Sequence, residues 1–331
     1  MKAKYSSGIV ATIFLAVSAM AASFVFMNRQ QIVDQVVVWQ YEPSSTVSTI
    51  TDRAQLTEKG KFFFYASRPE VDPPQKFNTE CQRKEERSAI LGCYVGTRIF
   101  IFDVQNTQLD GIEEVTAAHE MLHAAWDRLS DAERSRLTPL LEAVYQKVAD
   151  DELRERMDYY ARAQPGERVN ELHSIIGTEY PNLDNELEDH YKQYFKDRSV
   201  IVKFHDNYKA IFDNLAAKSD ALLVEIKNLE QTINTKVQAY NANKQAVEQE
   251  NQDIQREYKQ LDRSNSSAVN AYNAHVSSFN SRVNQLKAEY DSITSLTAQY
   301  DSKFEEYKSV ATSQQNLQKS IDSNLAPAPS F

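Results

Sequence analysis

The segment EVTAAHEMLHAAWDRL, residues 114–129, decides how the rest of the chain is interpreted. Its apolar residues recur three and four positions apart, which is the spacing of one face of an amphipathic α-helix. We expect this helix to bury the stripe formed by Val115, Ala118, Leu122, Ala125 and Leu129. His119 and His123 lie beside the stripe, so both imidazoles should project from the same side of the helix.

The motif within this helix, HEMLH, has the spacing of a zinc site. Residues four apart lie about one turn apart on one helical face, so His119 and His123 can direct ring nitrogens at a single ion. Zinc binds neutral imidazole, and catalytic zinc sites use three protein ligands plus a water molecule. Glu120 would flank the ion and accept a proton from the activated water. The same motif also occurs in helices that bind no metal, so a third ligand must be found elsewhere in the chain.

The composition of the 331-residue chain favours long helices and argues against nucleic-acid binding. The chain has only 7 glycines and 9 prolines, whereas turn-rich β folds use both residues heavily. Its formal net charge is −10, while contacts with phosphates need an excess of Lys and Arg. We therefore expect no nucleic-acid partner and no electrostatic binding to anionic lipid.

The N-terminal segment GIVATIFLAVSAMAASFVFM, residues 8–27, is an uncharged apolar run long enough to cross a bilayer as a helix. Lys2 and Lys4 precede it, so the positive-inside rule predicts a cytoplasmic N-terminus and an extracytoplasmic remainder. Residues 1–28 are accordingly predicted to be the transmembrane signal anchor of a single-pass membrane protein. The alternative is a signal peptide cleaved at Ala19–Ala21, after which the protein would be secreted. Both interpretations export the rest of the chain.

The chain contains two cysteines, Cys81 and Cys93. In an exported protein, an even number of closely spaced cysteines predicts a disulfide, here one that closes a small loop. The alternatives are two unpaired buried thiols or, with less support, a zinc site, since neither a CxxC spacing nor a nearby histidine accompanies them.

Residues 32–200 are expected to form one α+β domain around the HEMLH helix. β-Branched and aromatic residues predict strands at 35–41, 61–67 and 97–104, the third with apolar side chains on both faces. A helix that ends before Gly60 is expected between the first two strands.

Helix starts are marked by two predicted capping boxes. Asp110 with Glu113 and Ser130 with Glu133 have the required spacing of three residues. Further helices are expected up to about residue 163 and, after the sequence QPGE, on either side of GTEYPN.

Residues 205–325 are predicted to form a long antiparallel coiled-coil hairpin. Apolar residues alternate three and four apart in two stretches, and the turn-forming sequence DRSNSS, residues 262–267, separates them. Lys244 and Asn251 fall on the predicted seam and could fix its register. An intermolecular coiled coil is the alternative, and either form could dock a protein partner or a second copy. The last residues, 326–331, are expected to be a disordered tail.

Together with HEMLHAAWD, the later sequence NELHS resembles the gluzincins, the thermolysin-like branch of the zincin metallopeptidases. The resemblance covers about residues 35–195 and does not include the predicted hairpin. It implies a zincin-like domain, with a short β-sheet, the HExxH helix and a helical second half. It also implies that His119, His123 and Glu171 bind Zn2+ and that Glu120 is the general base, because the family's third ligand is a glutamate on a later helix, often in an NExxS context. Asn170 and Ser174 match that context.

The chain departs from the gluzincin pattern directly after Ser174. The thermolysin-like pattern has an aspartate there that orients a ligand histidine, whereas this chain has Ile175. Because such partners fix the direction of a ligand, another side chain, such as Asp127 or Glu179, would have to take the role.

Two further residues are alternatives to Glu171 as third ligand, namely His173 and Glu179. His173 is two residues from Glu171, about 200° around a helix, so both cannot face one ion. His173 and Tyr180 are also candidates for catalytic residues that stabilise the oxyanion of the transition state, and for each a structural role is the competing interpretation.

The hypothesis from the sequence is a membrane-anchored, extracytoplasmic zinc metallopeptidase that hydrolyses peptide bonds of a peptide or protein substrate. The substrate backbone would pair with the edge of the strand at 97–104. Two alternatives stay open at this point: a non-catalytic cell-envelope scaffold with a degenerate zincin domain, and a hydrolase of peptidoglycan peptide cross-links.

Overall fold

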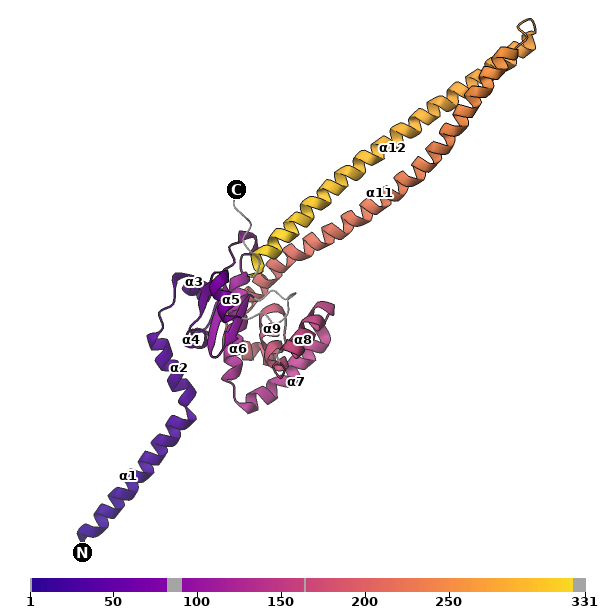
Figure 1. Ribbon diagram of the computed structural model, residues 1–331. Coiled ribbons are helices and arrows are strands. Elements are labelled where there is room, and N and C mark those ends of the chain that lie inside the picture. Colours follow the sequence, from indigo (N-terminus) through magenta and orange to yellow (C-terminus); the bar gives the residue numbers. More distant parts are fainter. Residues whose placement is uncertain (1, 82–90, 164, 324–331) are drawn as a thin grey trace. The chain divides into compact units, whose positions relative to one another are not determined.

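Figure 1 shows the computed structural model, which describes residues 2–81, 91–163 and 165–323. The chain divides into two compact units, a head unit of Met1–Ile211 with Leu317–Phe331 and a hairpin unit of Phe212–Asn316. Its elements in chain order are α1 (Lys2–Met27), α2 (Arg29–Gln40), α3 (Ser45–Arg53), α4 (Glu58–Ala66), β1 (Glu70–Asp72), α5 (Pro74–Glu80), β2 (Gly92–Val95), β3 (Arg98–Phe102), η1 (Thr107–Leu109), α6 (Ile112–Asp127), α7 (Asp131–Val148), α8 (Asp151–Ala163), α9 (Arg168–Glu179), α10 (Asn185–Tyr191), α11 (Ser199–Gln260) and α12 (Ser266–Ile321). Helices predominate and one small sheet accompanies them, so the α+β class is confirmed.

The N-terminal helices α1 and α2 contain the apolar segment expected to span a membrane. Within the described residues no single helix is long and apolar enough to do so, whereas Ala11–Met27 and Arg29–Gln40 together are, as a pair bent by 67°. The transmembrane anchor at residues 1–28 therefore stays a prediction. The predicted disordered tail, 326–331, lies outside the described residues.

Two of the three predicted strands are helices. Residues 35–41 fall mostly in α2, and residues 61–67 fall mostly in α4. The Thr57 hydroxyl caps α4 by accepting a hydrogen bond from the Gly60 amide at 3.1 Å, and Phe64 is completely buried. The β propensity of these runs is overridden because a helix satisfies their backbone groups locally and still buries one face against the core.

The strand predicted at 97–104 is confirmed as β3, the central strand of a three-stranded sheet with the order β1-β3-β2. β1 pairs with it in parallel and β2 in antiparallel orientation. Ile99 and Ile101 pack into the main core, whereas Phe100 and Phe102 pack into a second cluster on the other face. Both edges of β3 are therefore paired, and the predicted contact of a substrate with the edge of β3 is wrong. The edges of the described sheet belong to β1 and β2.

The predicted disulfide between Cys81 and Cys93 is confirmed, with Cα atoms 5.8 Å apart. It joins the end of α5 to β2. Most of the loop that it closes, residues 82–90, lies outside the described residues.

The start of α6 differs from the prediction. Its N-cap is Gly111, whose φ of 93° lies in the left-handed region that favours glycine. The predicted capping box does not form, because Asp110 binds Arg53 at 2.7 Å and Glu113 accepts a hydrogen bond from the Val104 amide at 2.9 Å. Partners from distant segments thus replace the local cap.

The second capping box is confirmed, since Ser130 and Glu133 exchange hydrogen bonds at the start of α7. The helices expected after it are also confirmed. They are α7 and α8, of which the second ends at Ala163, and then α9 and α10 on either side of GTEYPN.

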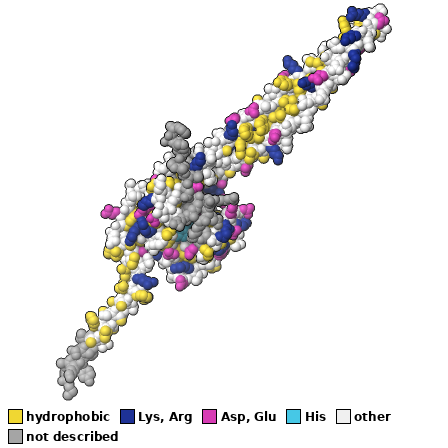
Figure 2. All heavy atoms as spheres, in the orientation of Figure 1, with side chains coloured by type: hydrophobic (Ala, Val, Ile, Leu, Met, Phe, Trp, Pro, Cys, Tyr) yellow, Lys and Arg dark blue, Asp and Glu magenta, His cyan; other side chains and the backbone are white. Residues whose placement is uncertain are grey.

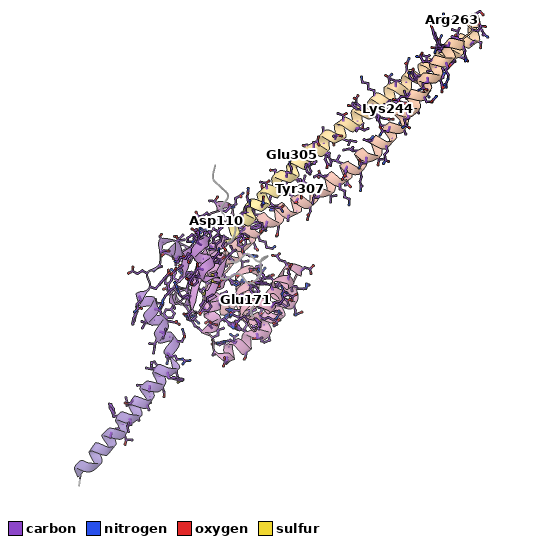
Figure 3. The ribbon with its side chains drawn as sticks, viewed as in Figure 1. Asp110, Glu171, Lys244, Arg263, Glu305 and Tyr307 are labelled. Carbon is purple, nitrogen blue, oxygen red and sulfur yellow. A yellow bond between two sulfur atoms is a disulfide. The ribbon has the colours of Figure 1, made fainter. Side chains whose placement is uncertain are left out.

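In the hairpin unit, α11 and α12 form an antiparallel helical pair. Cross-helix contacts join Glu225 to Lys303, Asn243 to Glu289, and Glu250 to Arg282. The residue numbers fall on α12 as they rise on α11, so the predicted hairpin is compatible with this pairing. On the predicted seam of α11, Leu222, Ile226 and Ile254 are buried, whereas Lys244, labelled in Figure 3, is exposed.

Candidate metal centre

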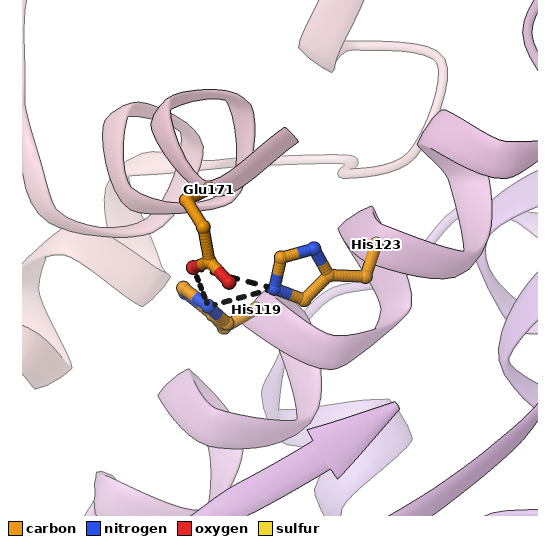
Figure 4. A group of neighbouring side chains, drawn as sticks. All are labelled: His119, His123 and Glu171. Atoms are coloured by element: carbon orange, nitrogen blue, oxygen red, sulfur yellow. Dashed lines mark hydrogen bonds and ion pairs between the residues drawn. The ribbon is translucent and has the colours of Figure 1, made fainter. Parts of the chain in front are cut away.

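Helices α6 and α9 pack against each other and bring the predicted ligands together. The predicted apolar stripe of α6 is buried as expected, from Val115 to Leu129. α9 buries Leu172, Ile175 and Ile176 in the same core. This packing leaves Glu171, in the first turn of α9, directed at the HEMLH side of α6 (Figure 4).

The side chains of His119, His123 and Glu171 converge on one small region (Figure 4). The two Nε2 atoms are 3.1 Å apart, and the Oε2 atom of Glu171 is 3.7 Å from each of them. The corners of a triangle with these sides lie about 2.0 Å from a common centre, which is the length of a zinc–nitrogen or zinc–oxygen bond. The three donor atoms are therefore spaced as the ligands of one zinc ion would be.

One oxygen of the Glu171 carboxylate has no hydrogen-bond partner among the described residues. That oxygen is Oε2, and Glu171 is 2% exposed. Burial would raise the pKa of Glu171, but the nearby imidazoles of His123 and His119 outweigh it and leave the pKa lowered. A buried, ionised oxygen without a donor is costly unless a cation satisfies it, so this atom fits a metal ligand.

His123 is held in the tautomer that metal binding needs. Its Nδ1 atom lies 2.9 Å from Oδ1 of Asn170, whose Nδ2 donates to Glu167 at 2.9 Å. Because that amide oxygen can only accept, Nδ1 carries the proton and the Nε2 lone pair faces the cluster. Asn170 thus takes the orienting role for which Asp127 and Glu179 were considered. Asp127 is instead exposed.

Glu120 lies beside the three ligands in a buried position. Burial raises the pKa of its carboxyl group. The charge of Glu171 adds to this shift, whereas His123 and His119 oppose it. β2 approaches it closely, because a Cβ atom on Gly92 would lie 2.6 Å from Cγ2 of Thr116 and 2.8 Å from Oε1 of Glu120. Glycine at position 92 is what allows the edge strand to contact the helix at this point.

Tyr160 of α8 is a site residue that the sequence reasoning missed. Burial raises the pKa of its phenol well above the ordinary value, and the carboxylates of Glu171 and Glu120 contribute to the shift. Burial therefore keeps the phenol protonated. The only signal in the sequence was its place on a helix between the two motifs, which it shares with Tyr159.

The remaining predicted site residues lie elsewhere. His173 is fully buried in the core, where its Nε2 is 2.8 Å from Nε2 of His190. Glu179 accepts two hydrogen bonds from Arg156, at 3.0 and 2.6 Å. Tyr180 follows Glu179, and its pKa is raised to about 12 by burial and by that carboxylate. Among the described residues, the cluster of ligand atoms includes neither His173 nor Glu179.

Two imidazoles and one carboxylate are a donor set that zinc accepts in catalytic sites. The His119 side chain is 16% exposed, compared with 10% for His123 and 3% for Glu171. Comparisons of the chain with models of protein families, with curated proteins and with solved structures found no match.

Proposed function

We propose that this protein is a zinc metallopeptidase with a zincin-like head. The observation that carries the proposal is the convergence of His119, His123 and Glu171 at zinc-ligand spacing. The order of elements supports it, because a central strand, the HEMLH helix and a later helix bearing a glutamate are what the gluzincin resemblance implies. The orienting contact from Asn170 adds support, since ligand histidines usually donate their second ring N–H to such a partner.

The chemistry follows from the residues around the ligand cluster. A zinc ion held there would supply Lewis acidity that activates water and polarises the scissile carbonyl. Glu120 accepts the proton of the attacking water and returns it to the leaving amine, and a buried carboxylate with a raised pKa is suited to both transfers. In this proposal the phenol of Tyr160, which burial keeps protonated, donates a hydrogen bond to the developing oxyanion.

The substrate in this proposal is an extended peptide that pairs with β2. β2 is an edge of the described sheet, and Gly92 within it contacts the side chain of Glu120. An added strand would make main-chain hydrogen bonds along that edge and would bring a peptide bond toward the ligand cluster.

The proposal includes export and membrane anchoring. Residues 8–27 are apolar, and the described ones expose large hydrophobic side chains along the helix, including Phe14, Phe24 and Met27. The Cys81–Cys93 disulfide fits an oxidising compartment. The hairpin would serve as a coiled-coil arm that docks a protein partner or a second copy.

Metal content and a matched pair of glutamate variants test the function. After loading and removal of excess metal, we expect about one zinc per wild-type chain and little in Glu171→Ala, since three protein ligands are the norm. Glu120→Gln should retain zinc and lose hydrolysis of a fluorogenic peptide library by at least about 100-fold. The exposed Glu155→Gln is the control and should keep both properties.

Each alternative function has its own outcome in the same experiment. A wild-type chain that holds no zinc would favour a non-catalytic scaffold and refute the proposal. Zinc-dependent release of peptides from purified peptidoglycan, without cleavage of the library, would favour a peptidoglycan hydrolase over a general peptidase. Hydrolysis by Glu120→Gln at the wild-type rate would refute the role of Glu120.

A further inference from the structure

One face of α2 is fastened to α4 and α6 in the core of the head unit. Asp34, 3% exposed, accepts two hydrogen bonds from Arg128 at the end of α6, both of 2.8 Å. The Arg128 guanidinium also lies over the ring of Phe63 in α4, at 5.3 Å from its centroid. The direction of α2 relative to the core is therefore fixed by a buried, bidentate ion pair.

The opposite face of α2 is apolar and exposed. Ile32, Val36 and Trp39 are 41%, 41% and 77% exposed. At 3.6 residues per turn, these three side chains lie within about 40° of the direction opposite Asp34, and Arg29 lies at the N-terminal end of the same face. Asp34 is the only acidic residue of α2, and Arg29 is the only basic one. Apolar side chains accordingly gather on the surface of this part of the chain (Figure 2).

α2 does not continue the axis of α1. The two helices meet at an angle of 67°, with Asn28 between them donating a hydrogen bond to the Phe24 carbonyl at 2.8 Å. Membrane-spanning helices tilt by about 20° on average from the bilayer normal. If α1 spans the bilayer, α2 therefore runs closer to the membrane plane than to its normal.

We propose that α2 is an interfacial helix that lies in the lipid headgroup region, with Ile32, Val36 and Trp39 directed into the bilayer. Asp34 on its other face holds the head unit through Arg128. The proposal rests on the proposed anchor, because α1 brings α2 to the membrane surface. Trp is enriched at this depth in membrane proteins, and a helix with one apolar face is the form that lies in the interface.

A lipid surface fits this face better than a second copy of the chain. These three side chains, with the exposed Val33 beside them, form a strip on one 12-residue helix, whereas a stable protein interface buries about 800 Å² on each partner. The strip also follows directly on the exposed apolar surface of α1. The contact is apolar, so it needs no anionic lipid and agrees with the net charge of −10.

Tryptophan fluorescence of the full chain in phosphatidylcholine vesicles tests the proposal. The chain has two tryptophans, and Trp126 is buried in the core at 7% exposure, so the difference between wild type and Trp39→Phe isolates Trp39. Lipids brominated near the headgroup end of the acyl chain should quench the Trp39 signal at least twofold more than lipids brominated near the chain end. Val36→Asp should reduce that quenching, whereas the exposed Gln31→Asp, on the side nearer Asp34, should leave it unchanged.

Three results would overturn the proposal. Equal quenching of wild type and Trp39→Phe would place Trp39 away from lipid. Stronger quenching by the deep bromines would mean that α2 continues into the bilayer core. If the quenching of Trp39 depended on the protein-to-lipid ratio and not on the bromine position, a second copy of the chain would be covering Trp39. Flotation of the vesicles reports separately on the anchor, and the zinc content reports separately on the metallopeptidase proposal.

Discussion

Replacing Asn170 with alanine isolates the hydrogen bond that orients a ligand histidine. The change removes the acceptor of the His123 Nδ1–H, which is buried and 2.9 Å from Oδ1 of Asn170. A buried donor left without a partner costs about 1–3 kcal/mol, which corresponds to about 5–150-fold in affinity. Removing partners of this kind from known metal sites weakens metal binding by about 10–100-fold. We therefore expect Asn170→Ala to lower the zinc affinity by about 10–100-fold.

Competition with a chromophoric chelator measures this affinity in the folded, full-length chain. Ser174→Ala is the matched control, because its hydroxyl is buried on the same helix and has no hydrogen-bond partner among the described residues. We expect the control to bind zinc like the wild type, and circular dichroism to show that both variants are folded. A zinc affinity of Asn170→Ala within twofold of the wild-type value would refute the assigned role.

Three further changes have defined outcomes. Gly92→Ala adds a Cβ atom 2.8 Å from Oε1 of Glu120, so hydrolysis of the peptide library should fall at least about tenfold while zinc content, measured by atomic absorption, is retained. Burial raises the pKa of Glu113 from 4.5 to about 7, so the folded state holds this proton more tightly than the unfolded state. The free energy of unfolding should therefore fall as the pH rises from 4 to 8, by about 1–2 kcal/mol once solvent screening of this partly exposed carboxyl is allowed for, and urea titrations of Glu113→Gln should lack that part of the decline. Asp34→Ala leaves Arg128 buried without its carboxylate, and denaturant unfolding in detergent should show a loss of about 3–5 kcal/mol, which Asp34→Ala combined with Arg128→Met should largely restore.

Features set by residues close together in sequence could be predicted. His119 and His123 share a helical face because they are four apart, and the Ser130–Glu133 capping box forms because its partners are three apart. The disulfide followed from the count and spacing of the cysteines. In each case the deciding interaction lies within a short segment, so few competing arrangements exist.

Features set by distant partners could not be predicted. The capping box expected at Asp110 was displaced by Arg53, which comes from α3. The strand expected at 35–41 became part of α2, where one face is occupied by the Asp34 ion pair and the other is apolar. A run of valines can form either a strand or a helix. The residue that favours the helix here is Arg128, which lies far along the chain from α2.

The same distinction between local and distant partners applies to the residues of the candidate site. Glu171 came from the resemblance, because no local rule connects it to the HEMLH helix. Asn170 was visible in the NELHS sequence, yet its contact with His123 depends on how α9 crosses α6. Tyr160 carries no local signal, since α8 is brought to the candidate site only by its packing on α9.

One helix links the candidate metal centre to the proposed membrane surface. α6 carries His119 and His123, and five residues after His123 the chain presents Arg128 to Asp34 of α2. Nearly every side chain between these points is buried, so the helix cannot turn about its axis without disrupting the core. A movement of α2 relative to α6 would therefore have to break the Asp34–Arg128 ion pair before it could displace His119 and His123. Loss of Asp34 should accordingly lower the stability of the fold and leave the zinc affinity of the folded protein close to the wild-type value, whereas loss of Asn170 should do the reverse.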